Sequence, residues 1–413
     1  MNEQWEKQFD TTKNILIDKG IDVENVITRI KKQVIELPSW AVGDSGTRYG
    51  VFRQEGAARN IWDKIDDCSE INRYVGISPV MASHALWDKP EDGDYKRVKK
   101  YALEHGLRIG TVHPNTFLGQ QLRLGSICNP DKNVRKETIE HFIDCVRIAR
   151  DLDSNAIGVW LADGTNYPGQ DHLRDRKHRL LDGMQALYNS LEDNMILLVE
   201  YKLFEPSFYT MDIMDWGMSL LVCNHLGPKA KVLVDLGHHA QGVNIEQIVA
   251  NLIDEERIGG FHLNNRKYAD DDLISGSVNP LELFLIFDQI VDAYTEETKK
   301  KAAEQIIYML DESHNIEPSI EGIIQSILNT QIAYCKALIV NRKELHAAQL
   351  HGEVLSANRI VMEAYETDVR PILMKARTEM GVPPDPIKDY RASGYAEKIA
   401  KERGKGGSGT LGG

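Results

Sequence analysis

The sequence predicts a (β/α)8 TIM barrel with an additional N-terminal helix and a C-terminal helical extension. Three observations point to this fold: strand-like and helix-like segments alternate, eight strand candidates occur, and several apolar runs end in a charged residue or a histidine. Strands buried on both faces read as continuous apolar runs, and their alternation with helices predicts a parallel sheet with helices outside it. Eight repeats fit a closed barrel better than an open sheet, and no strand candidate is followed by a GxGxxG fingerprint.

The expected elements follow in a regular order. Residues 1–34 form an N-terminal segment, helical over 3–34, and residues 35–315 form the barrel. The expected strands are 40–43, 74–84, 108–114, 156–164, 195–202, 231–239, 258–265 and 305–314. The expected barrel helices are 56–73, 94–106, 133–152, 171–193, 211–227, 245–257 and 279–298.

The C-terminal part contains no further strand pattern. Residues 316–404 predict a helical extension, with helices over 319–345 and 355–380. Helices added beyond a closed barrel pack on its wall or on a neighbouring subunit, so we expect this extension to serve oligomerisation. Residues 405–413 are rich in glycine and are expected to form a flexible tail.

Composition excludes several classes of protein. The formal net charge of -13 argues against a nucleic-acid surface, which needs a basic stripe. The five cysteines show no CxxC spacing, which argues against a disulfide framework or a zinc ribbon and favours a reducing compartment. The N-terminus has no signal-peptide pattern, and no apolar stretch approaches the roughly 18 residues that span a membrane. We therefore expect a cytoplasmic protein with no membrane partner.

Four of the apolar runs end in a residue that can bind a metal. These residues are Glu200, Asp235, His262 and Asp311. The carboxyl ends of barrel strands meet at one rim, where the active sites of such barrels lie. Three carboxylates and an imidazole form an oxygen-rich site, suited to Mn²⁺, Mg²⁺ or Co²⁺. A single Asp at such a place is most often a helix N-cap, but four aligned strand ends favour a metal site.

Further ligand candidates lie beside this set. His238 follows Asp235 by three residues, and Asp270 and Asp272 are spaced so that their side chains point the same way. Together with a bridging Asp235 they predict a second metal. Taken alone, the Asp270–Asp272 cluster reads as a solvated turn. Two neighbouring metals clamp vicinal oxygens and polarise a carbonyl, which suits C1 and C2 of a sugar.

Several motifs carry a specific resemblance. They are GDSGTRYGVF (43–52), VEYKLFEP (199–206), VDLGHHAQGVNIEQIVA (234–250), FHLNNRKYADDDL (261–273) and DYRASGYAEKIAKERG (389–404). The chain resembles the L-rhamnose isomerase family, whose members also act on D-allose and which is a branch of the xylose-isomerase-like barrels. The resemblance covers nearly the whole chain.

The resemblance implies two divalent metal ions per subunit, Mn²⁺ first, with Co²⁺ or Mg²⁺ as alternatives. It implies that the first ion is bound by Glu200, Asp235, His262 and Asp311. It implies that the second is bound by Asp235, His238, Asp270 and Asp272. It also implies a homotetramer in which an aromatic side chain of a partner subunit, corresponding to Tyr49 or Phe52, covers the pocket.

The resemblance also implies a sugar site. Lys202 corresponds to the family's lysine beside the first ligand, and His84 to its ring-oxygen histidine. Trp160 and Trp40 resemble the apolar walls that stack on the sugar. The expected activity is interconversion of L-rhamnose and L-rhamnulose, and of D-allose and D-psicose, by hydrogen transfer between C1 and C2. The transfer is either a hydride shift or proton transfer through an enediol, for which Asp311 or a metal-bound water is the candidate base.

Each of these residues is also compatible with a purely structural role. Lys202 can pair with a carboxylate, His84 can be a hydrogen-bonded core histidine, and a tryptophan is most often part of a core. His113 ends the third expected strand, and nothing in the sequence assigns it a role.

Three functional classes are compared. The first is a two-metal aldose–ketose isomerase. The second is a single-metal ketose 3-epimerase with a Glu-Asp-His-Glu ligand set, which Asp311 at the fourth position disfavours, although Glu312 follows directly. The third is a metal-dependent phosphodiesterase or nuclease, which the acidic charge disfavours.

Overall fold

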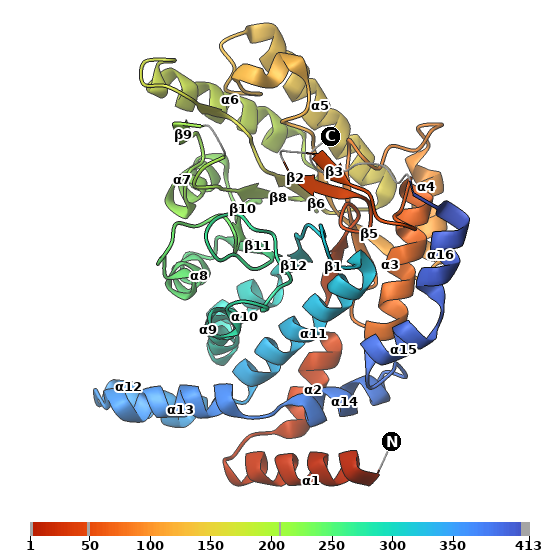
Figure 1. The fold of residues 1–413 in the computed structure, drawn as a ribbon. Coiled ribbons are helices and arrows are strands. Elements are labelled where there is room, and N and C mark those ends of the chain that lie inside the picture. The colour runs from red at the N-terminus through yellow and green to blue at the C-terminus, as the bar shows by residue number, and fades with distance from the viewer. Residues whose placement is uncertain (1–2, 48–49, 206–207, 406–413) are drawn as a thin grey trace.

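The computed structural model describes residues 3–47, 50–205 and 208–405. Its parallel strands close into a barrel in the order β1-β12-β11-β10-β8-β6-β5-β4, so the predicted (β/α)8 fold is confirmed (Figure 1). The barrel strands are β1 (Ile35–Pro38), β4 (Val80–His84), β5 (Arg108–His113), β6 (Ala156–Val159), β8 (Ile196–Glu200), β10 (Ala230–Asp235), β11 (Ile258–Leu263) and β12 (Ile307–Leu310).

Most strand residues are apolar and buried, and the register of the strands aligns their carboxyl ends. Asp235 at the end of β10 pairs with His262 of β11, and His84 of β4 pairs with His113 of β5. The backbone N–H of Asp311 donates to the carbonyl of Leu263, so the end of β12 meets the same rim. The functional face of the barrel is therefore fixed by backbone pairing.

A ring of helices surrounds the barrel. These helices are α3 (Ile61–Val75), α4 (Tyr95–Glu104), α5 (Lys132–Leu152), α6 (Leu173–Ser190), α7 (Trp216–Leu226), α8 (Ile245–Asp254), α9 (Pro280–Asp292), α10 (Glu297–Glu304) and α11 (Ser319–Leu338). Many begin at an Asn or Asp whose side chain accepts from the first turn, as Asn60 does for α3 and Asp215 for α7. α11 starts the segment assigned to the C-terminal extension, and it packs between α9 and α3.

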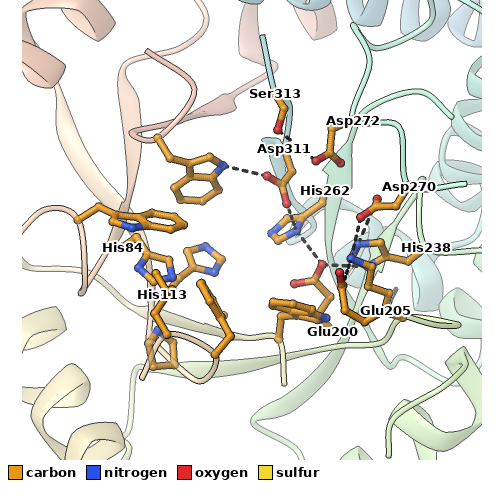
Figure 2. A pocket seen from close by; sticks show the side chains of 18 of the residues that line it. His84, His113, Glu200, Glu205, His238, His262, Asp270, Asp272, Asp311 and Ser313 are labelled. Carbon is orange, nitrogen blue, oxygen red and sulfur yellow. Dashed lines mark hydrogen bonds and ion pairs between the residues drawn. The ribbon is translucent and has the colours of Figure 1, made fainter. Parts of the chain in front are cut away.

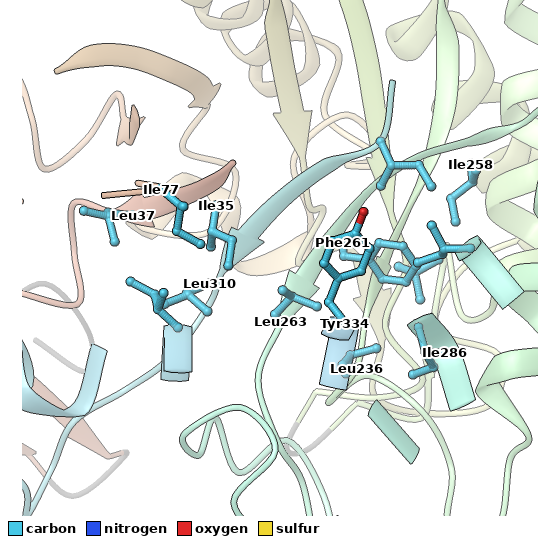
Figure 3. Close-up of a cluster of buried hydrophobic side chains, with 14 of the residues drawn as sticks. Ile35, Leu37, Ile77, Leu236, Ile258, Phe261, Leu263, Ile286, Leu310 and Tyr334 are labelled. Atoms are coloured by element: carbon cyan, nitrogen blue, oxygen red, sulfur yellow. The ribbon is translucent and has the colours of Figure 1, made fainter. Parts of the chain in front are cut away.

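The main core lies between the strands and this ring. Phe261 of β11 stacks on Tyr308 of β12, and Phe287 of α9 contacts both Tyr308 and Tyr334 of α11. Figure 3 shows Phe261 and Tyr334 among the buried side chains of this region. Burial of this apolar surface holds the strands in place and thereby fixes the rim.

The first strand differs from its prediction. Residues 40–43 were expected to form it, but β1 is Ile35–Pro38, and Trp40 lies in the turn that follows. The sequence IELP was not predicted to be a strand because Glu36 interrupts its apolar pattern. The Glu36 side chain is buried in the barrel, where its Oε2 accepts from the backbone N–H of Thr111 at 3.0 Å.

The N-terminal segment forms two helices where one was expected, α1 (Glu3–Asp18) and α2 (Val23–Lys32). After α11 come α12 (Arg342–Leu350), α13 (Val354–Glu366), α14 (Arg370–Glu379), α15 (Pro386–Ala392) and α16 (Tyr395–Arg403). α14 packs on α1 and α2, and α15 packs on α3 and α11, so helices of the C-terminal segment contact both N-terminal helices (Figure 1). Within the described residues no single helix has the length and apolarity to cross a membrane; α11 and α12 pass that test only jointly, across a 61° bend.

Short elements lie in the loops. They are β2 (Ser45–Thr47), β3 (Gly50–Phe52), β7 (Gly164–Thr165), β9 (Thr210–Met211) and the 3₁₀ turns η1 (Gln120–Leu124) and η2 (Ala293–Thr295). Two predictions fall on residues outside the described ranges: Tyr49, and positions 406–413 of the expected tail.

Candidate functional site

A cavity of about 380 Å³ opens at the carboxyl ends of the barrel strands. Its two sides differ in chemistry. Carboxylates and imidazoles from β8, β10, β11 and β12 and the loops after them line one side, and aromatic rings from β1, β4, β5 and β6 and their loops line the other. Figure 2 shows His84 and His113 on one side and Glu200, His262 and Asp311 on the other.

The structure brings the four strand-end residues together. Glu200, Asp235, His262 and Asp311 each offer a ligand atom, and these atoms lie within 4.8 Å of one another. His262 Nδ1 lies 3.1 Å from Glu200 Oε1 and 3.2 Å from Asp311 Oδ2. The same nitrogen lies 3.6 Å from Asp235 Oδ2. These atoms form the first ligand group.

A second group shares one member with the first. Asp235, His238 and Asp270 also offer ligand atoms within 4.8 Å of one another. His238 Nε2 lies 3.9 Å from Asp235 Oδ1 and 3.4 Å from Asp270 Oδ1. Nδ1 of His238 lies 3.0 Å from the carbonyl of Tyr201, to which it donates, so Nε2 is the nitrogen left for the second group.

Asp272 lies at the edge of this arrangement. It lines the cavity, but it is not one of the three members of the second group. Its Oδ2 accepts from the hydroxyl of Ser313 at 3.2 Å, and its backbone has a φ of 46°. Burial and the charge of Asp270 raise the pKa of Asp272 well above its usual range. Its role as a fourth ligand therefore stays a prediction.

The electrostatics of both groups fit a bound cation. Burial opposes a charge on His262, but the charge of Glu200 and the hydrogen bonds to Asp235, Asp311 and Glu200 together raise the pKa of His262 well above its ordinary value. Burial likewise opposes a charge on His238, yet Asp235 and Asp270 raise its pKa to about 9. Protonated imidazoles thus neutralise the carboxylates. A divalent ion would replace those protons, and oxygen-rich sets with an imidazole suit Mn²⁺, Co²⁺ or Mg²⁺.

Lys202 extends the polar side. Its Nζ lies 2.6 Å from Glu205 Oε2 and 2.7 Å from Asp270 Oδ2. The same ammonium lies 4.9 Å from the centre of the Trp160 ring. Burial opposes the charge of Lys202, but Asp270 and Glu205 outweigh it and raise its pKa. Lys202 is therefore a fixed positive charge between the ligand groups and the aromatic side.

His84 presents a defined tautomer to the cavity. The backbone N–H of Leu86 donates to His84 Nδ1 at 3.2 Å, so the neutral ring carries its proton on Nε2. Burial lowers the pKa of His84 to about 3, which keeps the ring neutral at physiological pH. The ring stacks on Trp87, with centroids 4.1 Å apart. His84 therefore offers one N–H donor within an aromatic setting.

The two predicted tryptophans line the cavity in different ways. The indole N–H of Trp40 donates to Asp311 Oδ1 at 2.9 Å, so this ring also orients a member of the first ligand group. Trp160 presents its face to Lys202, and its Nε1 is buried without a hydrogen-bond partner among the described residues.

Among the cavity-lining residues that were absent from the predicted site, five carry an aromatic ring or a hydrogen-bonding side chain. They are Trp87, His113, Phe117, Glu205 and Ser313. Each follows closely on, or ends, a barrel strand, and Glu205 lies inside the VEYKLFEP motif. Their position at or just after a strand end could have predicted these residues. Aromatic residues at such positions, however, belong to a core as often as to a site.

The chain belongs to the xylose isomerase-like TIM barrel family. The sequence pattern of this family matches residues 65–289, more than half of the chain. A probable sugar isomerase of Rhizobium meliloti is 41% identical over 402 residues, which cover 96% of this chain and 92% of that protein. Six of the seven predicted ligands lie in the family match, and Asp311 follows it.

More distant similarities extend this picture. An L-rhamnose isomerase of Bacteroides thetaiotaomicron is 20% identical over 337 residues, 75% of this chain and 77% of that protein. The solved structure of an L-ribulose 3-epimerase aligns with a TM-score of 0.53 at 14% identity, over 79% of this chain and 98% of that one. At that identity the structural match supports the fold alone.

Proposed function

We propose that this xylose isomerase-like barrel is a metal-dependent aldose–ketose isomerase. It would interconvert L-rhamnose and L-rhamnulose, and D-allose and D-psicose, by hydrogen transfer between C1 and C2 of the open-chain sugar. The observation that carries the proposal is the pair of ligand groups that share Asp235 and face an aromatic wall. The similarity to a probable sugar isomerase and to an L-rhamnose isomerase supports the choice of reaction and substrates.

The proposed metal ligands follow from the two groups. Glu200, Asp235, His262 and Asp311 would hold the first ion. Asp235, His238 and Asp270, joined by Asp272, would hold the second. When bound, two divalent ions supply a clamp for vicinal oxygens and polarise a carbonyl.

The remaining polar residues have separate tasks. His84 would donate its Nε2–H to the ring oxygen of the sugar and favour opening of the ring, since its other nitrogen is engaged by Leu86. Lys202 would place its positive charge beside the oxygen at C1 or C2 as negative charge develops there. Asp311 would accept the migrating hydrogen if it moves as a proton.

The aromatic side would exclude water and orient the carbon face of the sugar. Trp87 and Phe117 pack against the His84 ring, and Phe117 also contacts Trp160, with centroids 5.4 Å apart. An apolar wall opposite a charged one strengthens every electrostatic interaction between them, because the local dielectric constant is low.

A single-metal ketose 3-epimerase is the second candidate, because a glutamate, Glu312, directly follows Asp311. Its ligand set would need a glutamate at the fourth position. Glu312 is buried elsewhere, where it accepts from the backbone N–H of Ser275 at 2.9 Å and from the hydroxyl of Ser326 at 2.7 Å. Asp311 is the residue that joins the ligand group, which supports the isomerase over the epimerase.

Turnover by metal-stripped protein tests the proposal. With Mn²⁺ added back, we expect ketose formation from L-rhamnose and D-allose, and none without metal. D-xylose serves as a comparison aldose. Epimerisation of a ketose at C3, with no ketose formed from either aldose, would contradict the proposed function.

The homotetramer is proposed from the resemblance to the L-rhamnose isomerase family. Phe52 is the described candidate for the aromatic residue that covers a partner's pocket, and it is half exposed on β3. Light scattering of the purified protein would give the subunit number. Phe52→Ala should raise KM if the residue covers a neighbouring site, and an unchanged KM would exclude that role.

A further inference from the structure

Two neighbouring imidazoles at the cavity each have a buried nitrogen without a hydrogen-bond partner among the described residues. These atoms are Nε2 of His113 and Nε2 of His262. The two ring centroids lie 5.5 Å apart, with the planes inclined by 50°. The residues are 6% and 2% exposed, so bulk water does not satisfy these nitrogens. Buried polar atoms are nearly always paired, and two unpaired ones side by side require an explanation.

His262 Nε2 is a hydrogen-bond donor. Nδ1 of the same ring faces the carboxylates of Glu200, Asp235 and Asp311. Whether that nitrogen carries a proton or contacts a metal, the ring keeps its other proton on Nε2. His262 therefore presents an N–H toward the side of the ring away from the ligand group.

His113 Nε2 is a hydrogen-bond acceptor. A hydrogen bond with the backbone of Gly158 favours the protonated form of His113, so the ring donates in that bond. Because Nε2 has no partner, the donor is Nδ1. An imidazole ring that donates through Nδ1 carries the lone pair of its neutral form on Nε2.

Gly158 makes this placement of His113 possible. A Cβ at position 158 would lie 2.5 Å from Cε1 and 2.8 Å from Nδ1 of the His113 ring. Because Gly158 of β6 has no side chain, the ring of His113 from β5 fits against its backbone.

The geometry points to His113 as a positioning residue for His262. We propose that His113 Nε2 accepts a hydrogen bond from His262 Nε2–H, and that this bond fixes the orientation in which His262 Nδ1 faces the first metal. The inference rests on the proposed metal site, in which ligand histidines almost always donate their second N–H to a nearby acceptor.

Two further polar groups of this region have partners of their own. Glu36, a buried carboxylate of β1, accepts from the backbone N–H of Thr111. The indole N–H of Trp40 donates to Asp311. The His113 ring is adjacent to His262, and its Nε2 has no partner among the described residues.

Binding of Mn²⁺ to metal-stripped protein, measured by calorimetry, tests the inference without using catalysis. His113→Phe keeps a ring but removes the acceptor, and we expect Mn²⁺ binding at the first site to weaken about 10- to 100-fold. His113→Gln places an amide oxygen near the position of Nε2 and should keep the affinity within a few-fold of the original. Gly158→Ala displaces the His113 ring and should weaken binding as His113→Phe does.

A control variant and the unfolding temperature separate this role from a merely structural one. Phe117→Leu alters the same aromatic wall but contacts His84 and Trp160, so Mn²⁺ affinity should not change. The metal-free variants at position 113 should unfold within a few degrees of the original protein. Unchanged Mn²⁺ affinity in His113→Phe, or equal losses in the Phe and Gln variants, would overturn the inference. Absence of Mn²⁺ binding by the original protein would overturn the proposed function as well.

Discussion

The two halves of the barrel shift the pKa values of their histidines in opposite directions. At the ends of β10 and β11, His238 and His262 have raised pKa values, to about 9 for His238. At the ends of β4 and β5, His84 and His113 have lowered pKa values, to about 3 for His84. All four are buried, so burial alone does not distinguish them. The difference comes from the carboxylates that surround the first pair and the aromatic rings that surround the second.

This difference would allow one cavity to bind both cations and a sugar. The charged half compensates its carboxylates with protons in the absence of metal and can exchange them for divalent ions. The neutral half keeps fixed tautomers and flat apolar surfaces, which suit the carbon face of a sugar. A barrel permits this division because each strand end contributes its own side chains to the common rim.

Removing the shared carboxylate should give the largest effect. Asp235→Asn takes one ligand from both groups, and we expect kcat for ketose formation to fall about 1000-fold or more, since lost metal polarisation is worth several kcal/mol. Asp271→Asn is a matched control, because the Asp271 carboxylate accepts from the backbone N–H groups of Lys267 and Tyr268. Equal activity of the two variants would contradict the proposal that Asp235 is a ligand shared by both groups.

Removing the charge at the boundary of the two halves should have the next largest effect. Lys202→Met deletes the ammonium that lies between Asp270, Glu205 and Trp160. We expect kcat to fall about 100- to 1000-fold, as for loss of one preorganised group that stabilises developing charge. Mn²⁺ affinity should change little. A rise in KM alone would show that Lys202 binds the sugar without aiding the reaction.

The charged half should make Mn²⁺ binding depend on pH. Because a bound Mn²⁺ would displace the proton of His238, affinity should rise up to about tenfold per pH unit as pH increases toward 9. Calorimetric titration between pH 6.5 and 9 measures this slope. An affinity that does not change with pH would contradict the exchange of protons for metal.

The same proton should affect stability, and the sign follows from the direction of the shift. The folded-state pKa of His238 lies above its ordinary value of 6.5. Its contribution to stability is therefore complete below pH 6.5 and lost as pH rises through about 9. The unfolding temperature of metal-free protein should fall over this range, and that of Mn²⁺-loaded protein should fall less. A parallel decrease in both would assign the effect to other groups.

A substitution in the aromatic half should have the smallest effect, and this effect should be on binding of the sugar. Trp87→Leu removes the ring that stacks on His84. A lost aromatic contact of about 0.5–1.5 kcal/mol should raise KM roughly 3- to 10-fold with little change in Mn²⁺ affinity. Steady-state kinetics with L-rhamnose would measure it. A fall in Mn²⁺ affinity would show that the two halves are not independent.

The two halves also differ in how far the sequence predicts them. Glu200, Asp235, His262 and Asp311 end apolar runs, and a charged residue next to a buried strand is a strong signal, so this group was found from the sequence. Trp87 and Phe117 were missed because aromatic residues near strand ends are equally common in cores. The opposite tautomers of His84 and His113 depend on the backbone of Leu86 and Gly158, contacts that only the folded chain defines.

The first strand illustrates the same limit. Its run IELP carries Glu36, and a carboxylate inside a barrel strand contradicts the apolar pattern used to find strands. Glu36 is tolerated because Gly110 leaves room for it and Thr111 donates to it. Residues 35–38 thus form a strand because of contacts with another strand, and the periodicity of the sequence does not reveal such contacts.

The number of Mn²⁺ ions bound per chain tests the central claim most directly. Equilibrium dialysis of metal-stripped protein, with the bound metal counted by mass spectrometry, should give two ions per chain. His238→Ala, which removes a ligand of the second group alone, should leave one. A single ion in the original protein, unchanged in His238→Ala, would contradict the two-metal site and favour the epimerase.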